Sequence, residues 1–250
     1  MQQKATLSLP LAIVAAALII GASIIIVKKP DSAPVKNTAA AASQEINVKP
    51  VTSNDHILGD PNAPIKIVEF SDPSCPYCKV FNPTMEQIMS DYGASGKVAW
   101  VYRSFPLDKV GTAGAGKILH PNAGHEAQAL ECAASIGGNN GFWAFEKKLY
   151  EVTPSVSGDT PKGLDQSQLP VIAASVGLDK VAFTTCLDSG KMKDKVEAQY
   201  LDGINAGVSG TPYNFILTEG KKVAIPGALP YDQLKSALDI LINPGAATTN

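Results

Sequence analysis

The sequence has few of the residues that build metal centres, because only four cysteines and three histidines occur in 250 residues. Cys75 and Cys78 form one closely spaced pair, but a structural zinc site of this spacing needs a second such pair or paired histidines. An excess of charge of one sign is also lacking, since 21 basic and 23 acidic residues leave a net charge of -2. We therefore expect no metal site and no nucleic-acid partner.

An apolar run without charge occurs near the start of the chain, from Leu11 to Val27. Its length is at the lower limit for a membrane-spanning helix and long for the apolar core of a signal peptide. Because no small-x-small cleavage site follows it, residues 1–29 are predicted to be a single-pass anchor, with a cleaved signal as the alternative. Residues 30–56 are rich in Ala, Ser, Pro and Asn, which is typical of a flexible linker. The rest of the chain is then expected on the extracytoplasmic side of the cytoplasmic membrane.

Strand and helix patterns alternate after residue 57. Ile65 to Phe70 has the apolar character of a buried strand, a helical pattern runs from about Cys75 to Tyr92, and Lys97 to Arg103 is again strand-like. Five segments with helical spacing or capping signals follow, at 123–136, 140–150, 166–176, 179–188 and 191–206.

The last part of the chain returns to strand patterns at 214–218 and 222–225 and closes with a helical pattern at 231–242. The complete order predicts an α/β domain over residues 57–245, with an all-helical insert at about 108–206 and a short tail at 246–250.

The segment Cys75-Pro76-Tyr77-Cys78 lies between the first strand and its helix, which favours redox chemistry over a zinc site or two unreactive cysteines. Unpaired N–H groups and the positive end of the helix dipole stabilise a thiolate at a helix start. Cys75 is therefore predicted to be the exchanging sulfur and Cys78 the resolving thiol. Pro76 suits the first helical turn and leaves Cys75 at an exposed helix mouth.

The order of elements resembles the DsbA family of extracytoplasmic thiol oxidoreductases, which have a thioredoxin fold with an all-helical insertion. Here a single N-terminal transmembrane helix would precede that fold. The resemblance covers about residues 57–245 and rests on four separated landmarks. These are Val68-Glu69-Phe70-Ser71-Asp72 before the cysteine pair, 102–107, 120–133 with 142–145 and 149–150, and 207–212.

The resemblance implies roles for residues outside the cysteine pair. Glu69, on an otherwise apolar strand, would be a buried acid that exchanges a proton with Cys78, the alternative being a solvent-facing position on an edge. Thr211-Pro212 would be a cis-proline loop beside the dithiol, with the Thr211 backbone pairing with substrate. From the sequence alone, an ordinary trans proline is the alternative.

Two further cysteines, Cys132 and Cys186, fall in the helical insert and are predicted to form a structural disulfide, because free thiols are unfavourable in an oxidising compartment. Two buried thiols are the alternative. His120 and His125 are spaced by five, which is unsuited to a helical metal site, so capping or surface roles are expected.

The function that this reading predicts is disulfide formation or exchange in exported proteins, as in the periplasm, with no cofactor other than the Cys75/Cys78 disulfide. The substrates would be exported proteins that contain cysteines, and a quinone-linked thiol oxidase in the membrane would reoxidise the protein. Tyr77 brings no cationic partner for Cys75, so a milder oxidant is expected than relatives with histidine there. A reductase or isomerase is the alternative, and a non-catalytic binding module or chaperone is a third hypothesis.

Overall fold

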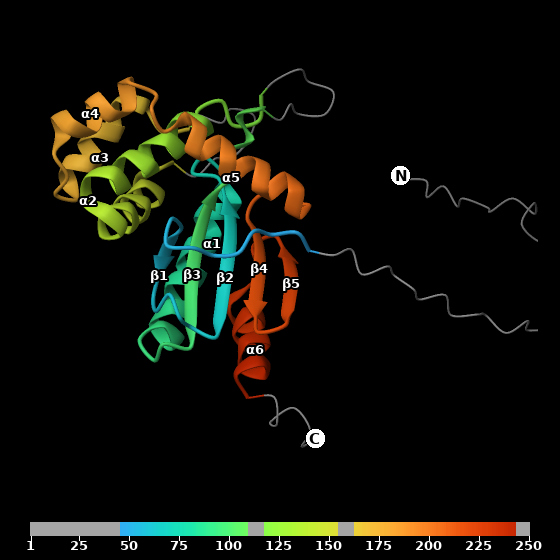
Figure 1. Ribbon diagram of the computed structural model, residues 1–250. Coiled ribbons are helices and arrows are strands. Elements are labelled where there is room, and N and C mark those ends of the chain that lie inside the picture. Colours follow the sequence, from blue (N-terminus) through green and yellow to red (C-terminus); the bar gives the residue numbers. More distant parts are fainter. Residues whose placement is uncertain (1–45, 110–117, 155–162, 244–250) are drawn as a thin grey trace, which may run out of the picture. The chain divides into compact units, whose positions relative to one another are not determined.

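The computed structural model describes residues 46–109, 118–154 and 163–243, and a five-stranded sheet forms the centre of the fold (Figure 1). The strand order is β1-β3-β2-β4-β5, in which β2 and β3 are parallel and the other neighbours are antiparallel. The strands are β1 (His56–Leu58), β2 (Ile65–Ser71), β3 (Val98–Ser104), β4 (Tyr213–Thr218) and β5 (Lys221–Pro226). β2 therefore lies in the middle of the sheet, and every second residue along it points to the same face.

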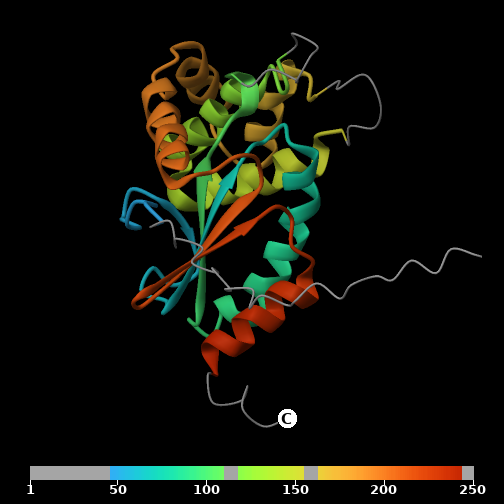
Figure 2. The same cartoon turned by 90° about the vertical axis from the view of Figure 1, so that its right-hand side faces the viewer.

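The two faces of the sheet bury separate clusters of apolar side chains. Ile67, from β2, packs with the helices α1 (Pro76–Ile88) and α6 (Tyr231–Ile242), which lie on the same side of the sheet (Figure 2). Val68 and Phe70 belong to the second cluster, against which α5 (Lys193–Ala206) packs through Tyr200. Because β2 is buried on both faces, its sequence is a nearly continuous apolar run rather than an alternating one.

The helical insert connects β3 to β4 and covers one end of the sheet (Figure 1). Its helices are α2 (Ala123–Val152), α3 (Leu169–Ser175), α4 (Lys180–Asp188) and α5. The gap between the segments predicted at 123–136 and 140–150 is a kink inside α2, where Gly138 has a φ of 63°, a conformation that favours glycine. The Asp179 side chain accepts a hydrogen bond from Ala182 N at 2.7 Å and caps α4.

The predicted α/β order, including the position of the helical insert, is confirmed. The final helix has the predicted bounds of 231 and 242, while the helix after the cysteine pair ends at Ile88 and continues as a π-helical turn, Met89–Gly93. None of the helices within the described ranges is long and apolar enough to cross a membrane. The anchor predicted at residues 1–29 and the tail at 246–250 lie outside those ranges.

The segment before residue 57 differs from the prediction of a flexible linker that extends to residue 56. Val48 is buried, and the guanidinium of Arg103 donates to the carbonyl oxygens of Lys49 and Pro50 at 3.1 and 3.2 Å. His56 begins β1, a three-residue edge strand that pairs with β3. The linker prediction is therefore wrong for residues 46–56, because buried Val48 and a buried arginine from the sheet together hold this segment on the domain.

Candidate functional site

Cys75 is held at the start of α1 by the turn that follows β2. Its backbone N–H donates to the carbonyl of Asp72 at 3.0 Å, and Pro76 takes the first helical position, where the missing N–H loses no hydrogen bond. The expectation of an exposed helix mouth is wrong for Cys75, which is only 3% exposed, although the neighbouring Tyr77 is 68% exposed. Access to the sulfur is limited because the loop before β4 packs against it, as described below.

The two thiols differ strongly in their affinity for a proton. A hydrogen bond from Cys78 outweighs the effect of burial and lowers the pKa of Cys75 to about 6. Burial raises the pKa of Cys78 well above its ordinary value, and the charges on Cys75 and Glu69 raise it further. In the dithiol state at neutral pH, Cys75 is therefore a thiolate and Cys78 a neutral thiol.

The loop before β4 brings Thr211 and Pro212 to the dithiol from more than 130 residues away. Cys75 Sγ lies 3.4 Å from the carbonyl oxygen of Thr211, and Pro212 is buried. The peptide bond between Thr211 and Pro212 is cis, as the resemblance implies. Because β4 pairs with β2, with Tyr213 opposite Phe70, the sheet itself fixes this loop beside the end of β2.

Glu69 lies inside the protein on the same face of β2 as Ile67. It is 2% exposed, and its carboxylate accepts hydrogen bonds from Ser71 Oγ at 2.6 Å and Trp100 Nε1 at 2.9 Å. Burial raises the pKa of Glu69 to about 7, although both hydrogen bonds act in the opposite direction. The solvent-facing alternative for Glu69 is wrong, because β2 has a strand on each side and helices over this face.

Asp72 and His120 belong to the same site, and the capping or surface role expected of His120 is wrong, because its side chain is 11% exposed and bonded to buried Asp72. The Asp72 carboxylate is fully buried and accepts hydrogen bonds from Ser74 N at 2.7 Å, Leu107 N at 2.9 Å and His120 Nδ1 at 2.8 Å. Although burial lowers the pKa of His120, the hydrogen bond and charge of Asp72 raise it on balance, and the charge on Cys75 adds to the rise. A protonated His120 would in turn stabilise the Cys75 thiolate, which Tyr77 cannot do.

The remaining cysteines, Cys132 and Cys186, join α2 to α4 in a disulfide with an S–S distance of 1.96 Å. Both are buried within the helical insert, and neither contributes to the dithiol site. His125 hydrogen-bonds Gln166 on the surface. The described part of the chain contains no group of three or more side chains suited to holding a metal ion.

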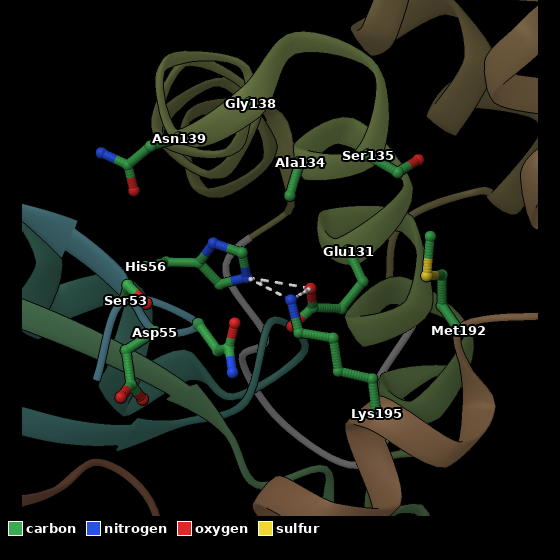
Figure 3. A pocket seen from close by; sticks show the side chains of 11 residues that line it. Ser53, Asp55, His56, Glu131, Ala134, Ser135, Gly138, Asn139, Met192 and Lys195 are labelled. Carbon is green, nitrogen blue, oxygen red and sulfur yellow. Dashed lines mark hydrogen bonds and ion pairs between the residues drawn. The ribbon is translucent and has the colours of Figure 1, made fainter. Parts of the chain in front are cut away.

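A separate cavity of about 590 Å³ lies where β1, α2 and α5 meet (Figure 3). The buried ring of His56 stacks on Phe142, with 3.8 Å between ring centroids, and its Nε2 lies 2.9 Å from Glu131 Oε2. Lys195 Nζ also contacts Glu131 Oε2, at 2.7 Å. The contacts of Glu131 with His56 and Lys195 tie β1 to the insert, so we assign the cluster to structure rather than to the dithiol chemistry.

Two thiols in one helical turn, one with a lowered pKa and one with a raised pKa, can form a disulfide with each other and pass it on to another protein in successive exchange steps. At the end of the first strand of a β-α-β unit, such a pair defines the class of thioredoxin-fold thiol–disulfide exchange proteins. The thioredoxin family model matches residues 51–240, and the chain belongs to this family. Its relation to the DsbA-like thiol–disulfide oxidoreductases, expected from the sequence, is confirmed.

Curated relatives of two kinds match the chain. Disulfide bond formation protein D of Bacillus subtilis is 26% identical over 213 residues, which is 81% of this chain and 84% of that protein. The Na(+)/H(+) antiporter NhaA 1 of Mycobacterium sp. (strain KMS) is 27% identical over 172 residues, which is 68% of this chain and 24% of the antiporter. The chain thus spans about a quarter of the length of such antiporters and matches only one part of them.

Solved structures agree on the fold. BdbD from Bacillus subtilis, in its oxidised form, superposes with a TM-score of 0.62 and 23% identity, covering 78% of this chain and 96% of that structure. Wolbachia pipientis alpha-DsbA1 gives a TM-score of 0.63 and 24% identity, covering 79% and 95% respectively. The thioredoxin fold with a helical insertion is therefore common to these proteins.

The raised pKa of Glu69 leads to a prediction for stability against pH. The carboxyl in the unfolded chain ionises near 4.5 and that in the folded protein near 7, so its contribution is full below 4.5 and is lost as the pH rises through 7. Glutamine does not ionise, and its amide can donate to Ser71 while its oxygen accepts from Trp100. Between pH 4 and pH 9, Glu69→Gln is expected to gain about 3 kcal/mol in free energy of unfolding relative to the unmodified dithiol protein.

Urea unfolding of both dithiol proteins at several pH values measures this difference. The reference comparison is Glu151→Gln, which replaces an exposed glutamate on α2 and should follow the unmodified protein at every pH. Parallel stability curves for Glu69→Gln and the unmodified protein would contradict a carboxyl that titrates near neutrality.

Proposed function

We propose that this protein is an extracytoplasmic thiol–disulfide oxidoreductase that donates the Cys75–Cys78 disulfide to exported proteins. The observation that carries the proposal is the opposite shift of the two thiol pKa values, which makes Cys75 a stable thiolate and therefore a good leaving group. A stabilised thiolate favours the dithiol form of the protein, so the disulfide form passes its bond on readily.

The exchange proceeds in two steps. A substrate thiolate attacks Cys75 Sγ in the oxidised protein, and the Cys75–Cys78 bond breaks. Cys78 leaves with the electron pair and is protonated, with Glu69 as the source of the proton. A second substrate thiolate then attacks the substrate sulfur of the mixed disulfide and expels the Cys75 thiolate. The substrate loses two electrons and gains a disulfide, while the protein gains the two electrons and becomes a dithiol.

The loop before β4 would position the substrate for the first step. Thr211 lies beside Cys75, and its backbone would pair with an extended substrate segment next to the sulfur. Pro212 would border the substrate segment on the same side as Thr211. Pro76 and the exposed Tyr77 would form the part of the substrate-binding surface that the cysteine motif itself contributes. Such a site would recognise the backbone of the substrate rather than a particular side chain, which suits a protein that acts on many substrates.

The location and partners follow from the sequence and from the relatives' names. The apolar run at 11–27 would anchor the chain in the cytoplasmic membrane, with the catalytic domain on the extracytoplasmic side, and a quinone-linked thiol oxidase in that membrane would reoxidise the dithiol. The name of the Bacillus subtilis relative, disulfide bond formation protein D, supports the oxidising direction.

Transfer of the disulfide to a reduced secreted protein tests the function. The oxidised protein is mixed with a reduced, unfolded protein that contains cysteine pairs, and substrate disulfides are counted by mass spectrometry after acid quenching. We expect one substrate disulfide for each Cys75–Cys78 pair consumed. Efficient reduction of insulin without oxidation of the reduced protein would indicate the reductase alternative, and cysteine-independent binding would indicate a chaperone.

A further inference from the structure

The exchange that we propose moves a proton to a buried sulfur and leaves the path of that proton to solvent unexplained. Cys78 is 0% exposed and Glu69 is 2% exposed, so neither can exchange a proton directly with water. A path must therefore begin among the groups that contact Glu69. The inference rests on the proposed function, but the step it concerns, protonation of Cys78, is required whenever the Cys75–Cys78 disulfide is reduced.

The contacts of Glu69 leave one group suited to this task. Its two carboxylate oxygens accept from Ser71 Oγ and from Trp100 Nε1. An indole N–H donates only and cannot accept a proton in return. A hydroxyl both donates and accepts, so Ser71 can pass a proton on without gaining or losing charge.

Ser71 stands between three groups. Its Oγ lies 2.6 Å from Glu69 Oε1 and 3.0 Å from the hydroxyl of Tyr150. It also acts on Cys78: although burial raises the pKa of Cys78 most, a hydrogen bond from Ser71 lowers it. Ser71 itself is fully buried, so its only connection to solvent is through its neighbours.

Tyr150, itself only 3% exposed, packs between this cluster and a neighbouring cavity. It lines a cavity of about 230 Å³ beside α1 and α2, whose other walls include Lys79, Asn82, Glu86 and Glu151. Its hydroxyl lies 3.0 Å from Ser71 Oγ and 3.2 Å from the carbonyl oxygen of Asp72. Tyr150 is thus shared by the buried cluster and by a cavity lined with polar and charged side chains.

We propose that Ser71 and Tyr150 form a proton relay that connects the cavity beside α1 and α2 with Glu69 and Cys78. When Cys78 leaves as a thiolate, Glu69 gives its proton to Ser71 Oγ while Ser71 gives its own proton to the Cys78 sulfur. Glu69 is then an anion. It regains a proton when Tyr150 donates to Ser71, Ser71 donates to Glu69, and Tyr150 takes a proton from the cavity, so both hydroxyls end as they began.

Other titratable groups face this cluster. Glu146 is buried on α2 and accepts a hydrogen bond from Asn82 Nδ2 at 2.6 Å, and burial raises its pKa well above the ordinary value. The hydroxyl of Tyr102 lies 3.5 Å from that of Tyr150. Tyr102 is fully buried and hydrogen-bonds Tyr150 rather than Ser71, which makes it a matched control.

The test compares Tyr150→Phe with Tyr102→Phe, since each removes one buried hydroxyl and keeps the ring. The oxidised proteins are mixed with dithiothreitol at pH 9, where Glu69, with a pKa of about 7, starts as an anion and the proton for Cys78 must come through Tyr150 and Ser71. The rate of disulfide opening is measured by acid quenching and mass analysis, in H₂O and in D₂O. Tyr150→Phe is expected to slow opening about tenfold or more and to enlarge the solvent isotope effect. Tyr102→Phe should stay within about twofold of the unmodified rate.

Chemical rescue separates proton transfer from a loss of structure. Imidazole or formic acid, small enough for the cavity, should restore part of the Tyr150→Phe rate and leave the unmodified protein unaffected. Ser71→Ala provides a second break in the path, with Ser71→Thr expected to recover the rate. Equal rates for the two tyrosine variants, or slowing with no isotope effect and no rescue, would overturn the relay. Because dithiothreitol reduces the disulfide whatever the natural substrate, this result stands apart from a failure to oxidise proteins.

Discussion

Serine in place of Cys75 is expected to reduce disulfide transfer to a reduced protein by at least about 1,000-fold, because a hydroxyl cannot replace a thiolate of low pKa as nucleophile or leaving group. The structure gives this variant little reason to unfold, since Cys75 is an N-cap position and serine is favoured there. Transfer is measured as substrate disulfides formed per minute, with thermal unfolding recorded for the same sample.

Cys78→Ser is the matched variant and should fail differently. Cys75 remains, so this protein should still react with an activated disulfide and form a mixed disulfide, but it has no partner thiol to release the bond. Because the hydrogen bond from Cys78 is the largest influence that lowers the pKa of Cys75, Cys78→Ala should also raise that pKa. If Cys75→Ser kept activity while Cys78→Ser lost it, the assignment of the two roles would be reversed.

The second large effect concerns the disulfide within the insert. Cys132 and Cys186 are 54 residues apart in sequence, and closing a loop of this length in the unfolded chain is worth about 4 kcal/mol in the chain-entropy model. Replacing both cysteines with alanine is therefore expected to lower the free energy of unfolding by about that amount. Urea unfolding of the double variant and the unmodified protein, both with Cys75 and Cys78 oxidised, measures the difference.

The same double variant should retain exchange at the dithiol, because neither cysteine of the insert lies in that site. Its Cys75 is expected to react with iodoacetamide at the rate of the unmodified protein at low urea concentration. A loss of stability below about 1 kcal/mol would contradict a cross-link that constrains the unfolded chain. A change in the reactivity of Cys75 would show that the insert and the dithiol are coupled.

The elements nearest the dithiol could be predicted because their signals are local. The apolar run Ile65 to Phe70, the cysteine pair and Pro76 occur within fourteen residues, and strand, turn and helix start each depend on near neighbours. The insert was also predictable in outline, since Gly138 and the cap residue Asp179 mark breaks that the structure contains. The residue order alone was enough to place Cys75 at the end of the first central strand.

The parts that escaped prediction depend on contacts between distant residues. His120 joins the site only through Asp72, 48 residues earlier, and nothing in its own neighbourhood indicates that contact. The cis bond at Thr211-Pro212 has no local signal and came from the family resemblance. β1 is three residues long, and the segment before it is fixed by distant partners, namely Arg103 and the apolar cluster into which Val48 packs. The burial of Cys75 likewise depends on the loop before β4.

The central claim is that the protein stabilises the Cys75 thiolate and so favours giving up its disulfide. The most direct test is the equilibrium reduction potential of the Cys75/Cys78 pair against glutathione. A thiolate with a pKa of about 6 lies between those of thioredoxin and DsbA, so we predict a potential between about -270 and -120 mV. A value at or below about -270 mV would contradict the account, because the dithiol would then act as a reductant.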